Sequence, residues 1–178
     1  MELVQIDGYT EDDKVAIARV VIRSKENLVV FVREIGFPDP DTFLATFADA
    51  SEWLDKTLDE VGVSAERAVL GGFSQGAVMS YALGLGADRP RPAAIVAFSG
   101  FVPRVEDFEL DLESRAGLLV SIAHGTFDPV IGVEWGRDAR ERLEAAGLAV
   151  SYREDPVAHQ ITPGGVAQAR AVVEKALD

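Results

Sequence analysis

The sequence predicts an α/β fold in which a mainly parallel central sheet carries helices on both faces. Short apolar runs alternate with longer amphipathic segments, and turn-forming residues separate the two kinds of segment. From residue 67 onward the expected order is strand, helix, strand, loop, strand, helix, strand, helix. Because neighbouring parallel strands are joined by crossovers that usually contain a helix, this alternation favours a parallel sheet covered on both faces.

The expected strands are short runs rich in valine, leucine and isoleucine. They cover residues 3–6, 15–22, 28–32, 67–73, 93–99, 117–123 and 148–154. The last four have the length and the bounding turn residues of buried strands. Ligands of such sheets bind beyond the carboxyl ends of the strands, so functional residues are expected in the loops that follow them.

Four segments have the periodicity of amphipathic or buried helices. They cover residues 41–61, a stretch from just after Ser74 towards Leu85, residues 133–146, and a stretch that follows Thr162-Pro163 to Leu177. In the first segment apolar residues recur at three- and four-residue steps, with Asp39 as N-cap and Pro40 at the first helical position. Gly147 is expected to end the third helix.

Composition limits the classes of function. The 178 residues are 48% hydrophobic and 26% charged, which is typical of one globular domain spanning residues 1–178. Lys and Arg total 17 against 30 Asp and Glu, so the net charge of -13 disfavours nucleic acid and anionic membrane surfaces as partners. There is no cysteine, which excludes disulfides and thiolate chemistry. Without a signal-like start or a long apolar run, a cytoplasmic protein is expected.

One motif suggests nucleophilic catalysis. Gly72-Phe73-Ser74-Gln75-Gly76 is a G-x-S-x-G pattern that follows a predicted strand and precedes a predicted helix. Glycines allow a tight turn that projects the serine hydroxyl, and the backbone N–H of Gln75 would form an oxyanion hole. By chance the bare pattern arises in about one chain in ten of this length, so a structural turn serine is the alternative; the strand–turn–helix context favours a nucleophile.

A serine nucleophile needs a base, and the chain has two histidines, His124 and His159. His159 follows strand 148–154 and precedes the last helix, which places it at the same sheet edge as Ser74. We therefore assign His159 as the base. His124 ends strand 117–123, where a structural role is expected and the role of base is the alternative.

The base needs a carboxylate to orient it, and Asp128 has the expected location. It lies in the loop after strand 117–123, beside the strand that leads to His159. Asp155 is closer to His159 in sequence, but Asp155-Pro156 is explained by turn formation. The order serine, aspartate, histidine is the order found in α/β hydrolases.

Several segments together resemble the carboxylesterase and phospholipase group of α/β hydrolases, which includes bacterial carboxylesterases and acyl-protein thioesterases. They are residues 71–83, 97–103, 124–131 and 158–162, and the resemblance covers residues 33–178. It implies hydrolysis of small to medium carboxylic esters, small-molecule substrates, through an acyl-enzyme on Ser74, with no metal or organic cofactor. His159 would transfer the proton and Asp128 would hold the imidazole. Thioesters or lysophospholipids are alternative substrates for the same triad.

Three apolar residues are candidates for the acyl pocket. Phe101, Val130 and Ile131 lie beside the expected strand ends, although ordinary core packing explains such residues as well. Trp53 and Trp135 fall in helical segments and are expected to be packing anchors.

The amino-terminal part departs from the family pattern. The family normally carries an early HG-x-G segment that supplies a second oxyanion donor, and neither Asp7-Gly8-Tyr9 nor Ile35-Gly36-Phe37 replaces it convincingly. Residues 1–32 instead form an atypical segment. Two expectations follow: an impaired or non-catalytic scaffold that binds small molecules is an alternative function, and a homo-oligomer would cover exposed sheet surface.

Overall fold

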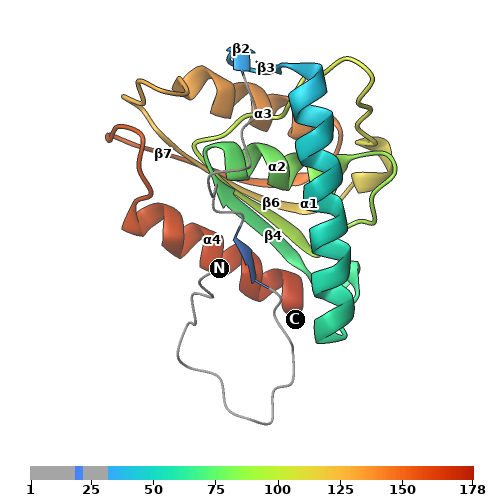
Figure 1. Ribbon diagram of the computed structural model, residues 1–178. Coiled ribbons are helices and arrows are strands. Elements are labelled where there is room, and N and C mark those ends of the chain that lie inside the picture. The colour runs from blue at the N-terminus through green and yellow to red at the C-terminus, as the bar shows by residue number, and fades with distance from the viewer. Residues whose placement is uncertain (1–18, 22–31) are drawn as a thin grey trace.

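The computed structural model describes residues 19–21 and 32–178 (Figure 1). Its strands are β1 (Arg19–Val21), β2 (Val32–Glu34), β3 (Phe37–Pro38), β4 (Val69–Phe73), β5 (Ala94–Phe98), β6 (Leu119–Gly125) and β7 (Ala149–Asp155). Its α-helices are α1 (Pro40–Val61), α2 (Gln75–Leu85), α3 (Val133–Ala145) and α4 (Pro163–Leu177). Short 3₁₀ turns cover Ala65–Arg67 and Glu113–Arg115.

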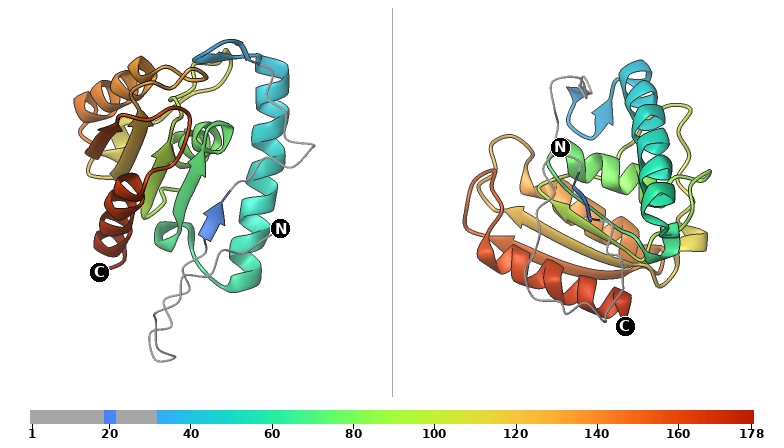
Figure 2. Two further views of the ribbon diagram at one scale, coloured as in Figure 1. Left: turned by 90° about the vertical axis from the view of Figure 1, so that its left-hand side faces the viewer. Right: turned by 60° about the horizontal axis from the view of Figure 1, so that its bottom comes forward.

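Five of the described strands form one parallel sheet in the order β1-β4-β5-β6-β7. Helices α1, α2 and α3 lie on one face of this sheet and α4 lies on the other (Figure 2). The predicted parallel α/β fold with helices on both faces is therefore confirmed. All loops that follow β4, β5, β6 and β7 leave the sheet at the same edge, because the strands are parallel.

The predicted strands of the carboxyl-terminal part are confirmed with shifts of one or two residues at their ends. In the amino-terminal part, the predicted run 15–22 contains β1, the run 28–32 meets β2 at Val32, and the run 3–6 lies outside the described residues. The antiparallel hairpin of β2 and β3 was not predicted. Its strands of three and two residues are too short to show an alternation of apolar and polar side chains.

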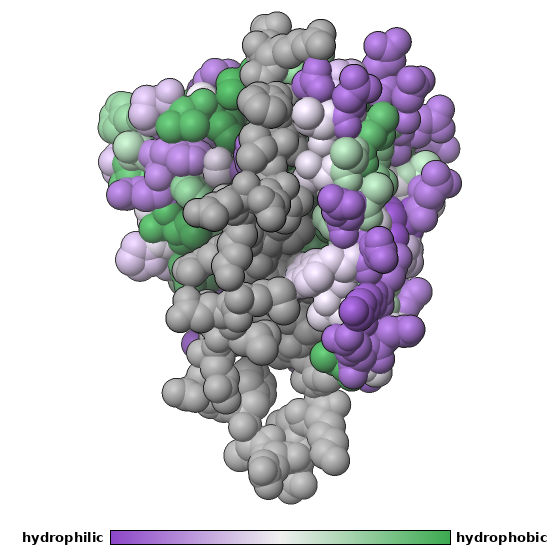
Figure 3. All heavy atoms as spheres, viewed as in Figure 1, coloured by the Kyte–Doolittle hydropathy of each residue, from purple (hydrophilic) through white to green (hydrophobic). Residues whose placement is uncertain are grey.

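Helix α1 begins and ends as its sequence predicts. The Asp39 side chain accepts a hydrogen bond from the backbone N–H of Thr42, and Pro40 occupies the first helical position. Gly62 ends the helix in the left-handed conformation, with φ of 66°. Its apolar stripe is buried, and hydrophilic side chains cover much of the side of the molecule on which α1 lies (Figure 3).

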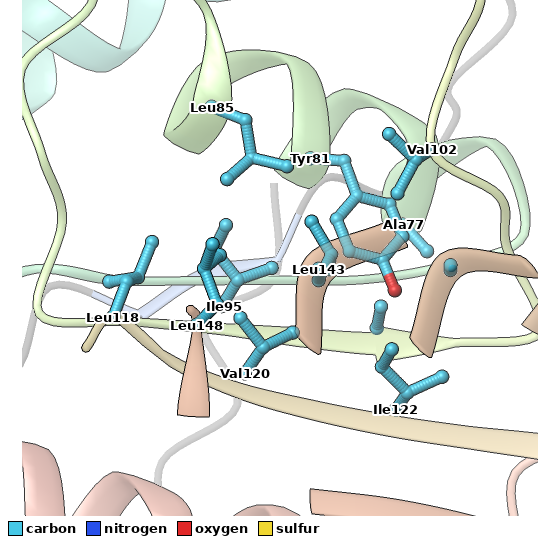
Figure 4. Close-up of a cluster of buried hydrophobic side chains, with 12 residues drawn as sticks. Ala77, Tyr81, Leu85, Ile95, Val102, Leu118, Val120, Ile122, Leu143 and Leu148 are labelled. Atoms are coloured by element: carbon cyan, nitrogen blue, oxygen red, sulfur yellow. The ribbon is translucent and has the colours of Figure 1, made fainter. Parts of the chain in front are cut away.

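Helix α2 is the centre of the main core. Ala77, Tyr81 and Leu85 of α2 pack against side chains of β5, β6 and α3 (Figure 4). Ten of its eleven residues are buried, which agrees with its apolar character on all sides. Ser74 directly precedes this helix, so its position is fixed by a firmly packed element. Among the helices of residues 32–178, none is both long and apolar enough to cross a membrane.

Candidate active site

Ser74 lies at a strained turn between β4 and α2. Its backbone has φ of 57° and ψ of -122°, a conformation that costs a residue with a side chain about 1–3 kcal/mol. The Ser74 N–H donates to the carbonyl oxygen of Phe98 at the end of β5, with 2.9 Å between the atoms. Although Ser74 is the N-cap residue of α2, its hydroxyl makes no capping hydrogen bond. The side chain instead lines a pocket at the carboxyl edge of the sheet.

The first glycine of the motif is required by close packing. A Cβ atom on Gly72 would lie 2.1 Å from the carbonyl carbon of Gly76, a distance that no structure tolerates. The strand therefore touches the first turn of α2 at these two residues. This contact holds the turn at Ser74 tight, and it explains why the sequence has glycine two residues before the serine.

Asp128 and His159 form a hydrogen-bonded pair. His159 Nδ1 lies 2.7 Å from Asp128 Oδ2, and Asp128 Oδ1 accepts from the backbone N–H groups of Val130 and Ile131, each at 2.9 Å. Burial by itself raises the pKa of Asp128, but the bonds from His159 and the two N–H groups outweigh it and leave the pKa below its ordinary value. Asp128 is therefore a carboxylate at neutral pH, aimed at the imidazole.

The loops after β6 and β7 bring this pair next to the serine turn. Backbone bonds join Thr126 to Asp155 and Phe127 to Val157 across the two loops. The His159 ring lies 4.6 Å, between centroids, from the ring of Phe73, the residue that precedes Ser74. Sequence reasoning did not select Phe73, although its variable position within G-x-S-x-G marks it as a neighbour of the nucleophile.

His124 and Asp155, the alternatives for the base and the acid, bind other partners. The His124 side chain is fully buried, and its Nε2 lies 2.8 Å from the carbonyl oxygen of Ile131. The Asp155 carboxylate accepts from Arg153 and from the Thr162 hydroxyl, at the start of α4. The pKa of Asp155 lies below its ordinary value because of these bonds, first that from Arg153. Neither geometry is that of a base or acid beside Ser74, so His159 and Asp128 remain the favoured pair.

A pocket of about 180 Å³ opens beside the serine. It is lined by Ile35, Pro38, Ser74, Gln75, Val78, Phe101, Val130 and Ile131. The three residues predicted for the pocket are thus all in its wall; Phe101 and Ile131 are buried, and Val130 is 53% exposed. Three further lining residues were not predicted from the sequence. Val78 could have been found because it is one helical turn after Ser74, whereas Ile35 and Pro38 arrive on the unpredicted hairpin.

The arrangement has the groups that acyl transfer needs. It provides a half-buried serine at a tight turn, an imidazole held by a carboxylate, and an apolar pocket whose wall includes the first residue of a helix, Gln75. In the described part of the chain, no group of three or more His, Asp or Glu side chains has the arrangement of a metal site.

The parallel sheet, its helices and the strand-to-helix turn at Ser74 define an α/β-hydrolase fold. Within that fold class, the chain belongs to the phospholipase/carboxylesterase family, a family of hydrolases whose match covers residues 33–177. The match begins at β2, so β1 and the residues before it lie outside the matched part.

Individual relatives agree with this assignment. The acyl-protein thioesterase 1 of Debaryomyces hansenii is 29% identical over 154 residues, covering 82% of this chain and 66% of that protein. The acyl-protein thioesterase 1 of Yarrowia lipolytica is 37% identical over 92 residues, covering 51% of this chain and 40% of that protein. The chain therefore spans between 40% and 66% of the length of these curated relatives.

Solved structures show the same fold. The crystal structure of the Bacillus cereus carboxylesterase superposes with a TM-score of 0.69 at 26% identity, covering 83% of this chain and 68% of that one. The carboxylesterase from Mesorhizobium loti superposes with a TM-score of 0.68 at 19% identity, covering 82% and 67% respectively, and supports the fold alone.

Proposed function

We propose that the chain is a serine carboxylesterase that hydrolyses small to medium carboxylic esters through an acyl-enzyme on Ser74. The observation that carries this proposal is the Asp128–His159 hydrogen bond of 2.7 Å beside the Ser74 turn, at an apolar pocket that Ser74 itself lines. Membership of a hydrolase family supports it.

The hydrogen bonds define the protonation state that the reaction needs. A carboxylate only accepts hydrogen bonds, so the bond to Asp128 requires the proton of His159 to reside on Nδ1. His159 Nε2 then has a free electron pair and takes the proton from Ser74 Oγ as this oxygen attacks the ester carbonyl. The imidazolium returns that proton to the leaving alcohol, and water, activated by the same imidazole, releases the acid and restores Ser74.

Negative charge that develops on the carbonyl oxygen needs hydrogen-bond donors. Gln75 follows Ser74 at the start of α2 and lines the same pocket. Its backbone N–H is our proposed oxyanion donor, aided by the positive end of the helix dipole.

The pocket volume supports short acyl chains. A cavity of about 150 Å³ holds one benzene ring, that is, six carbon atoms. The pocket of about 180 Å³ is only slightly larger. Acyl groups of roughly four to eight carbons are therefore the proposed substrates. A thioester with an acyl group of this size would fit the same site.

The test compares Ser74→Ala with the unchanged chain on p-nitrophenyl acetate, hexanoate and palmitate. Removal of the nucleophile should lower kcat by roughly 10³- to 10⁶-fold. Ser64→Ala removes an exposed hydroxyl near the far end of α1 and is the matched control; it should leave turnover unchanged. Equal turnover by Ser74→Ala and the unchanged chain would contradict the proposal.

A second candidate is a scaffold that binds small esters without hydrolysing them. The observation in its favour is the missing HG-x-G segment, since loss of one oxyanion donor lowers turnover by about 10²- to 10³-fold. A fluorophosphonate probe separates the two: labelling of Ser74 supports the hydrolase, and a folded chain that is never labelled supports the scaffold.

A further inference from the structure

A buried histidine that the proposed mechanism does not use lies directly behind the acid. His124 is in β6, four residues before Asp128, and its side chain has no exposed surface. Its Nε2 lies 2.8 Å from the carbonyl oxygen of Ile131. Because a carbonyl oxygen only accepts, Nε2 carries the ring proton in this bond and Nδ1 carries the lone pair. Within the part of the chain that the structure describes, Nδ1 is buried and has no hydrogen-bond partner.

Ile131 connects His124 to both halves of the site. The N–H of Ile131 donates to Asp128 Oδ1 at 2.9 Å, its carbonyl oxygen accepts from His124, and the residue lines the pocket. His124 Nε2 is 3.7 Å from Asp128 Oδ2, which is too far for a hydrogen bond. The histidine therefore reaches the acid through the backbone of Ile131 and not directly.

Helix α3 leaves space for this imidazole. Gly136 faces the ring, and a Cβ atom there would lie 2.7 Å from His124 Nδ1. Glycine is less favourable than alanine inside a helix, so the space that the ring needs explains the residue. A buried imidazole with one unpaired nitrogen is itself less favourable than an apolar side chain of similar volume. The glycine inside α3 and the unpaired nitrogen of the buried ring are each unfavourable. Both are explained if the hydrogen bond from His124 to Ile131 has a function.

We propose that His124 is a positioning residue of the active site. Its N–H holds the carbonyl of Ile131, so that the N–H of Ile131 keeps the Asp128 carboxylate aimed at His159 and the Ile131 side chain stays in the pocket wall. The effect on turnover rests on the proposed hydrolase function. The effect on the turn from Asp128 to Ile131 does not, and it is measurable separately.

The test compares two substitutions that differ in one hydrogen-bond donor. His124→Leu removes the donor, whereas His124→Gln keeps an N–H at a similar reach. For His124→Leu we expect kcat on p-nitrophenyl esters to fall roughly 10- to 100-fold, as for other misplaced catalytic groups. We also expect the amides of Val130 and Ile131 to exchange with deuterium at least about tenfold faster. His124→Gln should stay within about threefold of the unchanged chain in both measurements, because its donor replaces that of histidine.

Several results would overturn this role. Unchanged amide exchange in His124→Leu would show that the turn does not depend on His124, and equal losses in the two variants would assign the residue to packing alone. If the unchanged chain neither hydrolyses esters nor reacts with the fluorophosphonate probe, the proposed function fails while the exchange measurement still tests His124.

A second variant covers the case in which His124→Leu does not fold. Gly136→Ala favours the helix but moves the ring away from Ile131, so it should accelerate the same two amides. Normal exchange in a folded Gly136→Ala variant, with the ring displaced, would contradict the proposal.

Discussion

Protonation of a single imidazole should set the lower pH limit of hydrolysis. Asp128 has a pKa below its ordinary value, so it is ionised throughout the range from pH 5 to 8. Histidine is the side chain that ordinarily changes charge in that range, and a protonated His159 cannot accept the proton of Ser74. We expect kcat/KM for p-nitrophenyl acetate to fall in acid with the slope of one proton, because the base acts only when it is unprotonated. A profile that stays flat down to pH 4 would rule out His159 as base.

The proximity of the three candidate residues was predictable because each lies in the turn or loop that follows a strand. Ser74, Asp128 and His159 come after β4, β6 and β7, and parallel strands bring such positions to one edge. The pocket was less predictable. Ile35 and Pro38 reach it through a hairpin whose position depends on tertiary contacts, among them a bond from the Arg104 N–H to the Gly36 carbonyl at 3.1 Å. No local pattern encodes contacts between residues so far apart in sequence.

At the scale of the element, the start of α4 should support the loop that carries His159. The Thr162 hydroxyl accepts from the N–H of Gly165 at 2.9 Å and donates to Asp155 at the end of β7. Both ends of the His159 loop are thereby fixed. Thr162→Val keeps the shape of the side chain but removes the hydroxyl, so we expect the free energy of unfolding to fall by about 1 kcal/mol and kcat to fall several-fold. Urea unfolding and esterase assays measure the two effects.

Thr57→Val is the matched control for this substitution. The Thr57 hydroxyl donates to the Trp53 carbonyl within α1, at 2.7 Å and away from the site. Its removal should leave kcat unchanged. If Thr57→Val lowers kcat as much as Thr162→Val, the cap of α4 has no special connection with His159.

Local sequence patterns predicted the ends of helices better than the ends of strands. Asp39 and Pro40 at the start of α1, and Thr162 and Pro163 at the start of α4, are local signals, and both helices begin there. The end of the third helix near Gly147, with φ of 82°, is equally local. Strand ends shifted more, because they depend on the neighbouring strand. The run predicted from residue 67 begins at Val69, since Ala65–Arg67 form a 3₁₀ turn.

At the scale of the whole molecule, charge should make stability depend on both salt and pH. The net charge of -13 destabilises the folded chain at pH 7 through mutual repulsion. Salt screens this repulsion, so about 0.5 M sodium chloride should raise the urea midpoint at pH 7 and have a smaller effect near the pI of about 4.5. A midpoint that falls with salt at pH 7 would show that attractive ion pairs outweigh the repulsion.

Below pH 4, the protonation of paired carboxylates should lower the stability of the fold, and this loss should outweigh the relief of charge repulsion. Hydrogen bonds from Arg89, Arg137 and Arg153 lower the pKa values of Asp55, Glu154 and Asp155 respectively. A carboxyl whose pKa is lower in the folded than in the unfolded chain stabilises the fold fully above its unfolded pKa, near 4, and loses that contribution as the pH falls through its folded pKa. The urea midpoint should therefore drop steeply between about pH 4 and pH 2. Glu154→Gln, which removes one such group, should make this drop shallower; an identical drop would mean that its pair with Arg137 contributes nothing to the acid sensitivity of the fold.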